Sequence, residues 1–389
     1  MSTEYLSERV KGIFLSKIRE VMEKTKRLKA KGLDIVDFSM GRTDFDTPYH
    51  IKEAAKKALD QGMVHYTTSV GTISLREAIS LRMKQDYNLE TNPSEIIVTT
   101  GSTEAIYIAT QTMLNPGDEF LIPDPMYVYY EGWSFLGGAK AVNFPFDILI
   151  NNPQALKQYI TENTKLLILT SPHNPTGQVI KKDSLEIIAD LAKENDFYVI
   201  SDDVYYKILY DNLDYCNIAL FEKMKERTMI IGSLSKTYSM DGWRVGYLIG
   251  PKEMIDQALK MHQHVENCPN TFVQEGAKIA LTSSQSCVDK MVSEFDRRRR
   301  LMMSFFDELK IPYARPQGAF FIFPNISKYG MTSKEFCDFL LEEAKLAAVP
   351  GDAFGKYGEG YVRFAYTKSY ENIEKGLNRI KKALDKLIL

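Results

Sequence analysis

The sequence has few of the features that mark secreted, membrane-bound or nucleic-acid-binding proteins. Only four of its 389 residues are cysteine, and no C-x-x-C pair suggests a disulfide framework or a zinc site. No apolar run approaches the roughly 18 residues needed to cross a bilayer, and the charged start, MSTEYLSERVKG, lacks the apolar core of a signal peptide. Lys and Arg (49) nearly balance Asp and Glu (51), which leaves no broad positive field for nucleic acid. We therefore expect a cytoplasmic protein that binds small metabolites, without membrane or nucleic-acid partners.

Short apolar runs alternate along the chain with longer segments of helical period. Runs such as LLIL and FYVI are apolar at every position, as expected of strands covered by helices on both faces. This alternation predicts an α/β fold with a mainly parallel sheet. We expect strands at 95–99, 120–123, 166–170, 198–201, 229–232 and 245–249, and helices at 103–114 and 183–194.

The character of the sequence changes near residue 283. A long charged helix is expected at 287–309, followed by strands (AFFIFP, YVRFAY) mixed with amphipathic helices. The segment 1–45 contains a basic helix and a short strand, DIVDF, but no obvious core of its own, so we expect it to pack on the C-terminal unit. The sequence thus predicts a large domain, 46–284, inserted between the two parts of a smaller α+β domain, 1–45 and 285–389.

Three charged or titratable patterns have simple structural explanations. The run RRRR at 297–300 lies on the long helix near Asp and Glu residues, so we expect a solvated face. The basic segment 17–32, KIREVMEKTKRLKAKG, is expected to be a surface helix. His262 and His264 lack an acidic or cysteine partner at ligand spacing and are a weak metal signal. No metal site is predicted.

The most informative segment is 231–250, IGSLSKTYSMDGWRVGYLIG. Lys236 follows directly after an apolar strand, where burial lowers a lysine pKa and leaves an amine that can form a Schiff base with an aldehyde. Ser233, Ser235 and the guanidinium of Arg244 could bind a phosphate nearby. A solvated turn would account for S-x-S-K alone, but the whole stretch indicates pyridoxal 5′-phosphate (PLP).

These motifs resemble those of the class I/II aminotransferases, PLP-dependent enzymes of fold type I. The resemblance runs from DFDTP at 44–48 to YVRFAY at 361–366 and is strongest to the bacterial aspartate-aminotransferase-like branch. It implies a large domain with a mainly parallel seven-stranded sheet flanked by helices, and a smaller α+β domain. It also implies that Lys236 holds the cofactor as an internal aldimine, while the serines and the arginine of the same segment grip its phosphate.

A carboxylate ends the predicted strand of VISDDVYYKI, 199–208. Asp202 is thereby placed at the carboxyl edge of the sheet, where α/β proteins bind ligands. A carboxylate facing the pyridine nitrogen of PLP keeps that nitrogen protonated. A helix N-cap is the competing explanation for Asp202. The resemblance assigns Asp202 to the ring nitrogen and Tyr205 to the phenolic oxygen, with Asp203, where the family usually has Glu, outside the site.

Two further loops follow predicted strands. In SPHNPTG, 171–177, the resemblance implies that Asn174 contacts the phenolic oxygen and that the peptide bond before Pro175 is cis, with His173 a loop residue. In IVTTGSTEAI, Ser102 and Thr103 open a helix whose free N–H groups suit a phosphate. Ordinary helix capping is compatible with that role.

Two aromatic residues gain a role only through the resemblance. Tyr127 in PDPMYVYY matches the ring that stacks on the pyridine, although an aromatic in such a run is more often part of the core. Tyr66 in HYTTSVG matches the tyrosine that reaches the cofactor phosphate of a partner chain. The resemblance therefore implies a homodimer with shared active sites.

Arg363 lies on an alternating apolar strand and needs an anion if its face is buried. The resemblance implies that it holds the α-carboxylate of the substrate, together with Asn174 and the backbone at Gly41. The family usually reads G-x-P-D-F around that glycine. Here Arg42 and Thr43 depart from the pattern.

The expected activity is a ping-pong transamination between an L-amino acid and a 2-oxo acid through the Lys236 Schiff base. A β-lyase or aminocyclopropane-carboxylate-synthase-like enzyme of the same fold is one alternative. A non-catalytic, PLP-binding regulatory module is another. Thr103 occupies a position where some aspartate-specific relatives carry a basic residue, which leaves neutral and aromatic amino acids open as substrates.

Overall fold

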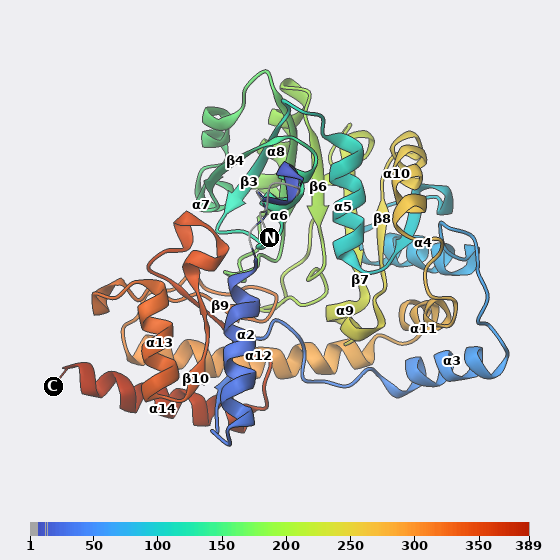
Figure 1. The fold of residues 1–389 in the computed structure, drawn as a ribbon. Coiled ribbons are helices and arrows are strands. Elements are labelled where there is room, and N and C mark those ends of the chain that lie inside the picture. The colour runs from blue at the N-terminus through green and yellow to red at the C-terminus, as the bar shows by residue number, and fades with distance from the viewer. Residues whose placement is uncertain (1–6, 12, 14, 389) are drawn as a thin grey trace.

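A seven-stranded sheet forms the centre of the larger part of the protein, as Figure 1 shows for the computed structural model, which describes residues 7–11, 13 and 15–388. The strand order is β2-β8-β7-β6-β5-β3-β4, and β8 alone runs antiparallel to its neighbours. The mainly parallel α/β fold is therefore confirmed. The strands are β2 (Ile96–Thr99), β3 (Glu119–Asp124), β4 (Lys140–Pro145), β5 (Thr164–Thr170), β6 (Tyr198–Asp202), β7 (Thr228–Ser233) and β8 (Gly246–Ile249).

The six strands expected from apolar runs match these bounds within two residues. The seventh, β4, carries no continuous apolar run because it lies at the sheet edge and only Phe144 is buried in it. The pattern of apolar residues alone therefore did not predict β4.

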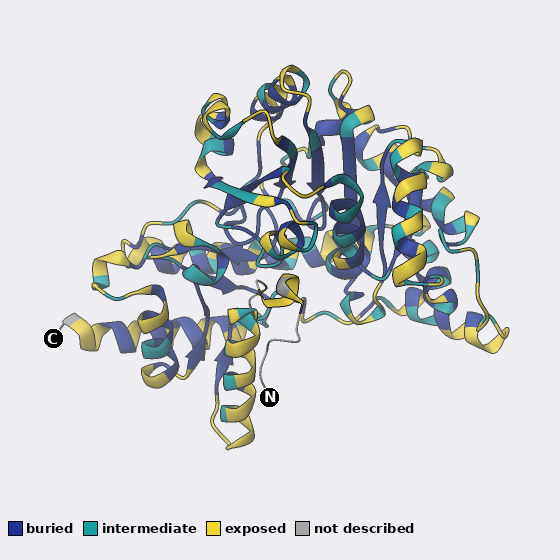
Figure 2. Cartoon of the chain, turned by 45° about the horizontal axis from the view of Figure 1, so that its top comes forward, coloured by how far each residue is buried: buried dark blue, intermediate teal, exposed yellow. Residues whose placement is uncertain are grey.

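Helices cover both faces of the sheet, which explains the unbroken apolar strands (Figure 2). Alternate side chains of one strand enter different cores: Leu166 and Ile168 pack with α5, α6 and α10, while Leu167 and Leu169 pack with α8. Side chains also alternate between two cores in β7, where Ile230 packs with α4 and α11. The helices of this part are α3 (Tyr49–Asp60), α4 (Ile73–Tyr87), α5 (Ser102–Met113), α6 (Tyr130–Leu136), α7 (Asp147–Asn151), α8 (Lys182–Glu194), α9 (Leu234–Thr237), α10 (Lys252–Val265) and α11 (Thr271–Thr282).

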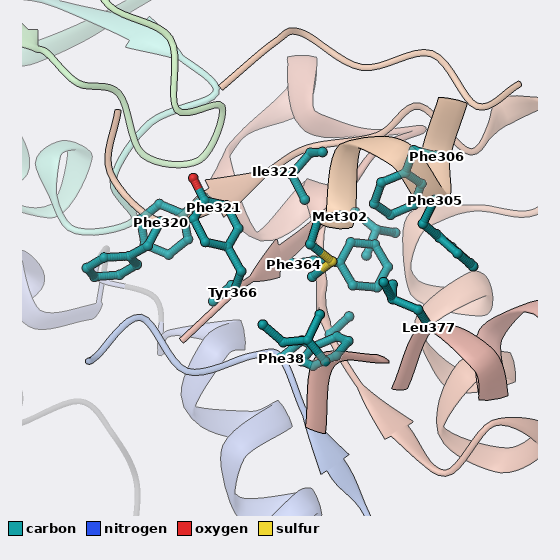
Figure 3. Packing of buried hydrophobic residues seen from close by; sticks show 14 of the residues in the cluster. Phe38, Met302, Phe305, Phe306, Phe320, Phe321, Ile322, Phe364, Tyr366 and Leu377 are labelled. Carbon is teal, nitrogen blue, oxygen red and sulfur yellow. The ribbon is translucent and has the colours of Figure 1, made fainter. Parts of the chain in front are cut away.

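The C-terminal part builds a second, aromatic core together with the N-terminal segment (Figure 3). Phe38 meets Phe364 edge-on at a centroid distance of 6.3 Å, and Phe306 lies 5.5 Å from the same ring. This part contains two small sheets, β1-β10 and β11-β12-β9. Its elements are β1 (Val36–Asp37), α12 (Ser286–Glu308), β9 (Phe321–Ile322), α13 (Ser333–Glu343), β10 (Leu346–Ala347), β11 (Val349–Pro350), β12 (Val362–Ala365) and α14 (Tyr370–Ile388).

The N-terminal helices, α1 (Glu8–Lys11) and α2 (Lys17–Ala30), precede β1. In Figure 1 the blue α2 runs beside α13 and β10, and its Lys24 pairs with Asp338 of α13 at 2.6 Å. This packing supports the predicted division into domains, whose boundaries stay a prediction. Residues 1–6, 12, 14 and 389 of the predicted smaller domain lie outside the described residues. Among the helices that the structure describes, none is long and apolar enough to cross a membrane.

The expectation that the arginine run at 297–300 forms a solvated face is wrong for its two central members. Arg298 and Arg299 are buried because the helical period turns them towards the interior. Arg299 binds Asp211 at 2.7 Å, and Arg298 binds Asp44 at 2.7 Å. Both partners belong to loops far from α12 in the sequence, so the run fastens α12 to the rest of the protein.

Replacing Arg299 by alanine should lower the free energy of unfolding by about 3 kcal/mol, since it removes a fully buried side chain together with its bonds to Asp211, Asp296 and the carbonyl of Pro316. The denaturation midpoint in urea, followed by far-ultraviolet circular dichroism, measures this loss. The neighbouring Arg300 is 62% exposed and also contacts Asp211, so R300A should cost less than about 1 kcal/mol. Equal losses in the two variants would contradict the assigned role of Arg299.

Candidate active site

A cavity of about 300 Å³ lies at the carboxyl ends of β5, β6 and β7, facing the smaller part of the protein. Ligands of α/β proteins bind at this edge because the loops that leave parallel strands converge there. The predicted site residues that line it are Gly41, Ser102, Thr103, Tyr127, Asn174, Asp202, Tyr205, Ser235, Lys236, Arg244 and Arg363. Ser233 and Tyr66 are the predicted residues that do not line it.

Lys236 enters the cavity from the one-turn helix α9, directly after β7. Its Nζ donates a hydrogen bond to the carbonyl of Gly41 at 2.8 Å. Burial, with contributions from the positive charges of Arg244 and Arg363, lowers the pKa of Lys236 to about 8. Near neutral pH this amine is therefore a better nucleophile towards an aldehyde than an ordinary lysine.

Asp202 is the last residue of β6 and is buried. Tyr130 donates a hydrogen bond to its Oδ2 at 2.5 Å, and the backbone N–H of Val204 lies 3.4 Å from Oδ1. Burial raises the pKa of Asp202 to about 6 although these donors oppose the shift. A cation placed against this carboxylate would stabilise its charged form.

The N-terminus of α5 forms a cup for an anion. Ser102 and Thr103 open the helix, and Gly101 precedes them at φ 82°. A Cβ at Gly101 would lie 2.4 Å from Nη2 of Arg244, so only glycine lets the guanidinium come this close. Hydroxyls, helix N–H groups and an arginine fork together match a phosphate.

Arg363 is a buried cation on β12, 2% exposed. Its Nη1 donates to Oδ1 of Asn174 at 3.0 Å and its Nη2 to the carbonyl of Ser39 at 2.8 Å. Phe321 and Phe354 pack against the guanidinium at 4.5 and 4.8 Å. No carboxylate of the described residues pairs with it, its Nε has no hydrogen-bond partner, and burial lowers its pKa to about 10. Such a group calls for an anion from outside the chain.

The sequence and the fold are both similar to those of known proteins. The family model "Aminotransferase class I and II" matches residues 33–380. The chain is 43% identical to an aspartate aminotransferase of Pyrococcus abyssi, over 97% of this chain and 98% of that protein. It is 39% identical to aromatic-amino-acid aminotransferase 2 of Thermococcus litoralis, with coverage of 97% and 98%. The crystal structure of an aromatic aminotransferase from Pyrococcus horikoshii superposes with a TM-score of 0.89 at 41% identity, covering 94% of this chain and 99% of the other.

The chain belongs to the class I and II aminotransferases. It is accordingly an enzyme that transfers amino groups, and the lyase and regulatory alternatives are not favoured. Members of this family depend on PLP. The structure is of fold type I, as the resemblance implied.

Two predicted residues of this aminotransferase lie outside the cavity. Ser233 caps α9, and its Oγ accepts a hydrogen bond from the N–H of Ser235 at 3.1 Å. Tyr66 is 82% exposed and borders a separate cavity of about 510 Å³ that also touches Arg244. The phosphate contacts assigned to both residues stay predictions.

Three residues near the site, Pro175, His173 and Asp203, were expected to have no catalytic role, and their contacts are structural. The Asn174–Pro175 peptide bond is cis, as implied. His173 is buried, stacks on Phe146 at 3.6 Å, and its pKa falls to about 3 through burial. Asp203 points away from the cavity and accepts hydrogen bonds from the hydroxyls Tyr87 Oη, Tyr215 Oη and Ser201 Oγ, and from the Asn217 amide.

The unusual G-R-T-D-F loop keeps Gly41 at the cavity. Thr43 is buried and hydrogen-bonds to Ser239 at 2.8 Å, while Arg42 is exposed. The hydroxyl at Thr43 therefore anchors the loop where the family usually has proline.

Sequence reasoning missed several residues of the site. Tyr130 has no signal of its own among the tyrosines of PDPMYVYY, because its contact with Asp202 depends on how α6 packs on the sheet, against β3 and β4. Ile18, Arg19 and Met22 of α2 also line the cavity. The surface helix expected at 17–32 is confirmed, since α2 is mostly exposed, but no local pattern shows that an N-terminal helix folds back to border the cavity.

Replacing Arg363 by methionine should raise the free energy of unfolding of the cofactor-free protein by about 1–2 kcal/mol, because it removes a buried charge that has no anionic partner. Thermal unfolding of the apoprotein measures the effect. R298M is the matched control: Arg298 is equally buried but pairs with Asp44 and Glu294, so this variant should lose about 3 kcal/mol. Destabilisation of R363M to the same extent would show that Arg363 is already compensated.

Proposed function

We propose that the cavity at the carboxyl ends of β5–β7 is the active site of this aminotransferase and that it holds PLP. The observation that carries the proposal is that Lys236, with its lowered pKa, and Asp202, with its raised pKa, line one cavity beside the cup at the α5 N-terminus. An amine, a carboxylate and a phosphate site are the three groups that PLP requires.

The residues present fit the cofactor. Its phosphate would be held by Ser102, Thr103, Ser235 and Arg244, its ring nitrogen by Asp202, and its phenolic oxygen by Tyr205 and Asn174, with Tyr127 against the ring. When bound, PLP supplies an aldehyde that condenses with amines and a ring that withdraws electrons from the substrate α-carbon.

The chain's own groups then perform three tasks. Lys236 Nζ would accept the proton from the substrate α-carbon and deliver it to the exocyclic carbon of the cofactor, a role suited to an amine whose pKa lies near 8. Asp202, supported by Tyr130, keeps the ring nitrogen protonated. Arg363 fixes the α-carboxylate, while its hydrogen bond to Asn174 Oδ1 sets the direction of the guanidinium. Repeating these tasks with a 2-oxo acid completes a ping-pong transamination.

Replacing Lys236 by alanine should abolish covalent attachment of the cofactor and lower kcat by at least ~10²–10⁴-fold, the usual contribution of an acid–base group. Borohydride reduction of the loaded enzyme, followed by mass spectrometry of the peptide that contains position 236, measures attachment. Lys252, an exposed residue paired with Asp256, provides the control K252A, which should behave as wild type. Covalent label and turnover retained in K236A would refute the proposal.

We further propose amino acids with aromatic side chains as preferred donors. Tyr127, Tyr129, Ile18, Met22 and Phe321 give the cavity an apolar lining. Relatives named for aromatic substrates support this choice.

A second candidate, a dicarboxylic substrate, is favoured by Arg19, an exposed cation that lines the same cavity. Relatives named for aspartate support it. Both classes can use one site if Arg19 meets the distal carboxylate of the second substrate.

The variant R19Q separates the two classes. It should lower kcat/KM for glutamate or aspartate by about tenfold, the scale of one lost charged hydrogen bond, and leave tyrosine and phenylalanine within about twofold. Half-reactions followed by the cofactor absorbance measure this. An equal loss for both classes would show that Arg19 does not select the distal group.

A cytoplasmic homodimer in which Tyr66 reaches the partner's phosphate site is part of the same proposal. The 82% exposure of Tyr66 in the single chain, beside Arg244, supports this assignment.

A further inference from the structure

His262 on α10 is fully buried, and both of its ring nitrogens face oxygen atoms. Nδ1 lies 2.7 Å from Oε1 of Glu104, and Nε2 lies 2.8 Å from the carbonyl oxygen of Ser69. Its neighbour two positions on, His264, is exposed. The described residues contain no cluster of three His, Cys, Asp or Glu side chains that could hold a metal ion, so the histidine pair has another explanation.

The partners decide the protonation state of the ring. A backbone carbonyl can only accept a hydrogen bond, and so can an ionised carboxylate. The second oxygen of Glu104 accepts the N–H of Thr100 at 2.5 Å, as a carboxylate does. With Glu104 as a carboxylate, both nitrogens of His262 donate, and the ring is an imidazolium.

Glu104 stands in the first turn of α5, the helix whose N-terminus forms the anion cup. An uncompensated carboxylate there would repel a phosphate that binds one turn away, because both anions compete for the same helix dipole. The imidazolium of His262 pairs with this carboxylate and removes most of the repulsion.

The same histidine joins three segments that are distant in sequence. Glu104 holds the loop before α5 through Thr100, and Glu266 at the end of α10 accepts from the Thr100 hydroxyl. Ser69 belongs to the segment that carries Tyr66. His262 thus links the phosphate cup to the segment predicted to reach the partner subunit.

We propose that His262 is a cationic positioning residue that neutralises Glu104 and thereby keeps the α5 N-terminus able to bind the phosphate of PLP. The inference rests on the proposed function of the cup. Burial alone would lower the pKa of His262, but the hydrogen bonds that the ring donates to Glu104 and to the carbonyl of Ser69, with the charges of Glu104 and Glu266, outweigh burial, and the net shift is upward.

The test is the dissociation constant of PLP, measured by equilibrium dialysis of the apoenzyme. H262Q keeps a hydrogen-bond donor but loses the charge, so its dissociation constant should rise about tenfold, equal to ~1.4 kcal/mol. E104Q removes the charge that needs compensation and should stay within about threefold of wild type. The double variant H262Q/E104Q should recover most of the affinity that H262Q loses, whereas a purely structural role predicts a double variant at least as weak as H262Q.

Two controls isolate the charge effect. H264Q changes the exposed histidine of the same helix and should bind PLP as wild type does. Pyridoxal, which lacks the phosphate, should bind H262Q and wild type equally. A phosphate-independent loss in H262Q would overturn the proposal.

The failures of the two proposals are distinguishable. Wild-type apoenzyme that binds no PLP would defeat the proposed function, and this inference with it. Wild type that binds PLP while H262Q binds it equally well would defeat this inference alone. If H262Q fails to fold, nitrogen-15 spectra of histidine-labelled wild type decide, with the signal of the other buried histidine, His173, identified first: two protonated ring nitrogens at His262 support the proposal, and one overturns it.

Discussion

The site depends on ionisable side chains that are held away from water, where no opposite charge of the described residues offsets the effect of burial. Burial pushes each of them towards its neutral form: the pKa falls to about 8 at Lys236, rises to about 6 at Asp202 and falls to about 10 at Arg363. Each pKa shift reflects a loss of folding stability that lasts until a ligand compensates the buried group. An aldehyde-bearing phosphate and an amino acid carboxylate are ligands that relieve all three. The remainder of the structure holds these groups in place while they are uncompensated.

The groups of the site are held in position by segments that lie far apart in the sequence. Lys236 and Asp202 follow two adjacent parallel strands, so their relative position is set by the sheet. Arg363 comes from the other core, whose aromatic packing includes Phe38 of the N-terminal segment (Figure 3). Arg299 of α12 then fastens the two parts through Asp211, while Arg298 ties α12 to the N-terminal segment through Asp44. Misplacing one part would separate the arginine from the amine.

Local patterns predicted the part of the fold and site that local physics controls. The strands of the sheet interior are apolar at every position, and a lysine or aspartate at a strand end is visible in a single segment. The contacts that escaped prediction all depend on tertiary placement. Tyr130 meets Asp202 only because α6 packs on the sheet against β3 and β4, and α2 lines the cavity only because the chain folds back. Arg298 and Arg299 differ from the exposed arginines beside them solely in the direction they face.

Whether a buried charged side chain is structural or binds a ligand is better judged from its partners than from its degree of burial. Arg299 and Arg363 have almost the same exposure, yet the first is surrounded by carboxylates and the second by carbonyl, amide and aromatic groups. The first is complete within the chain and acts as a structural fastening, while the second is incomplete and awaits a ligand. His262 is an intermediate case, because it pairs with a carboxylate in the first turn of α5, beside the proposed phosphate site. In our proposal its charge acts on the phosphate through Glu104, and the site then extends beyond the residues that line the cavity.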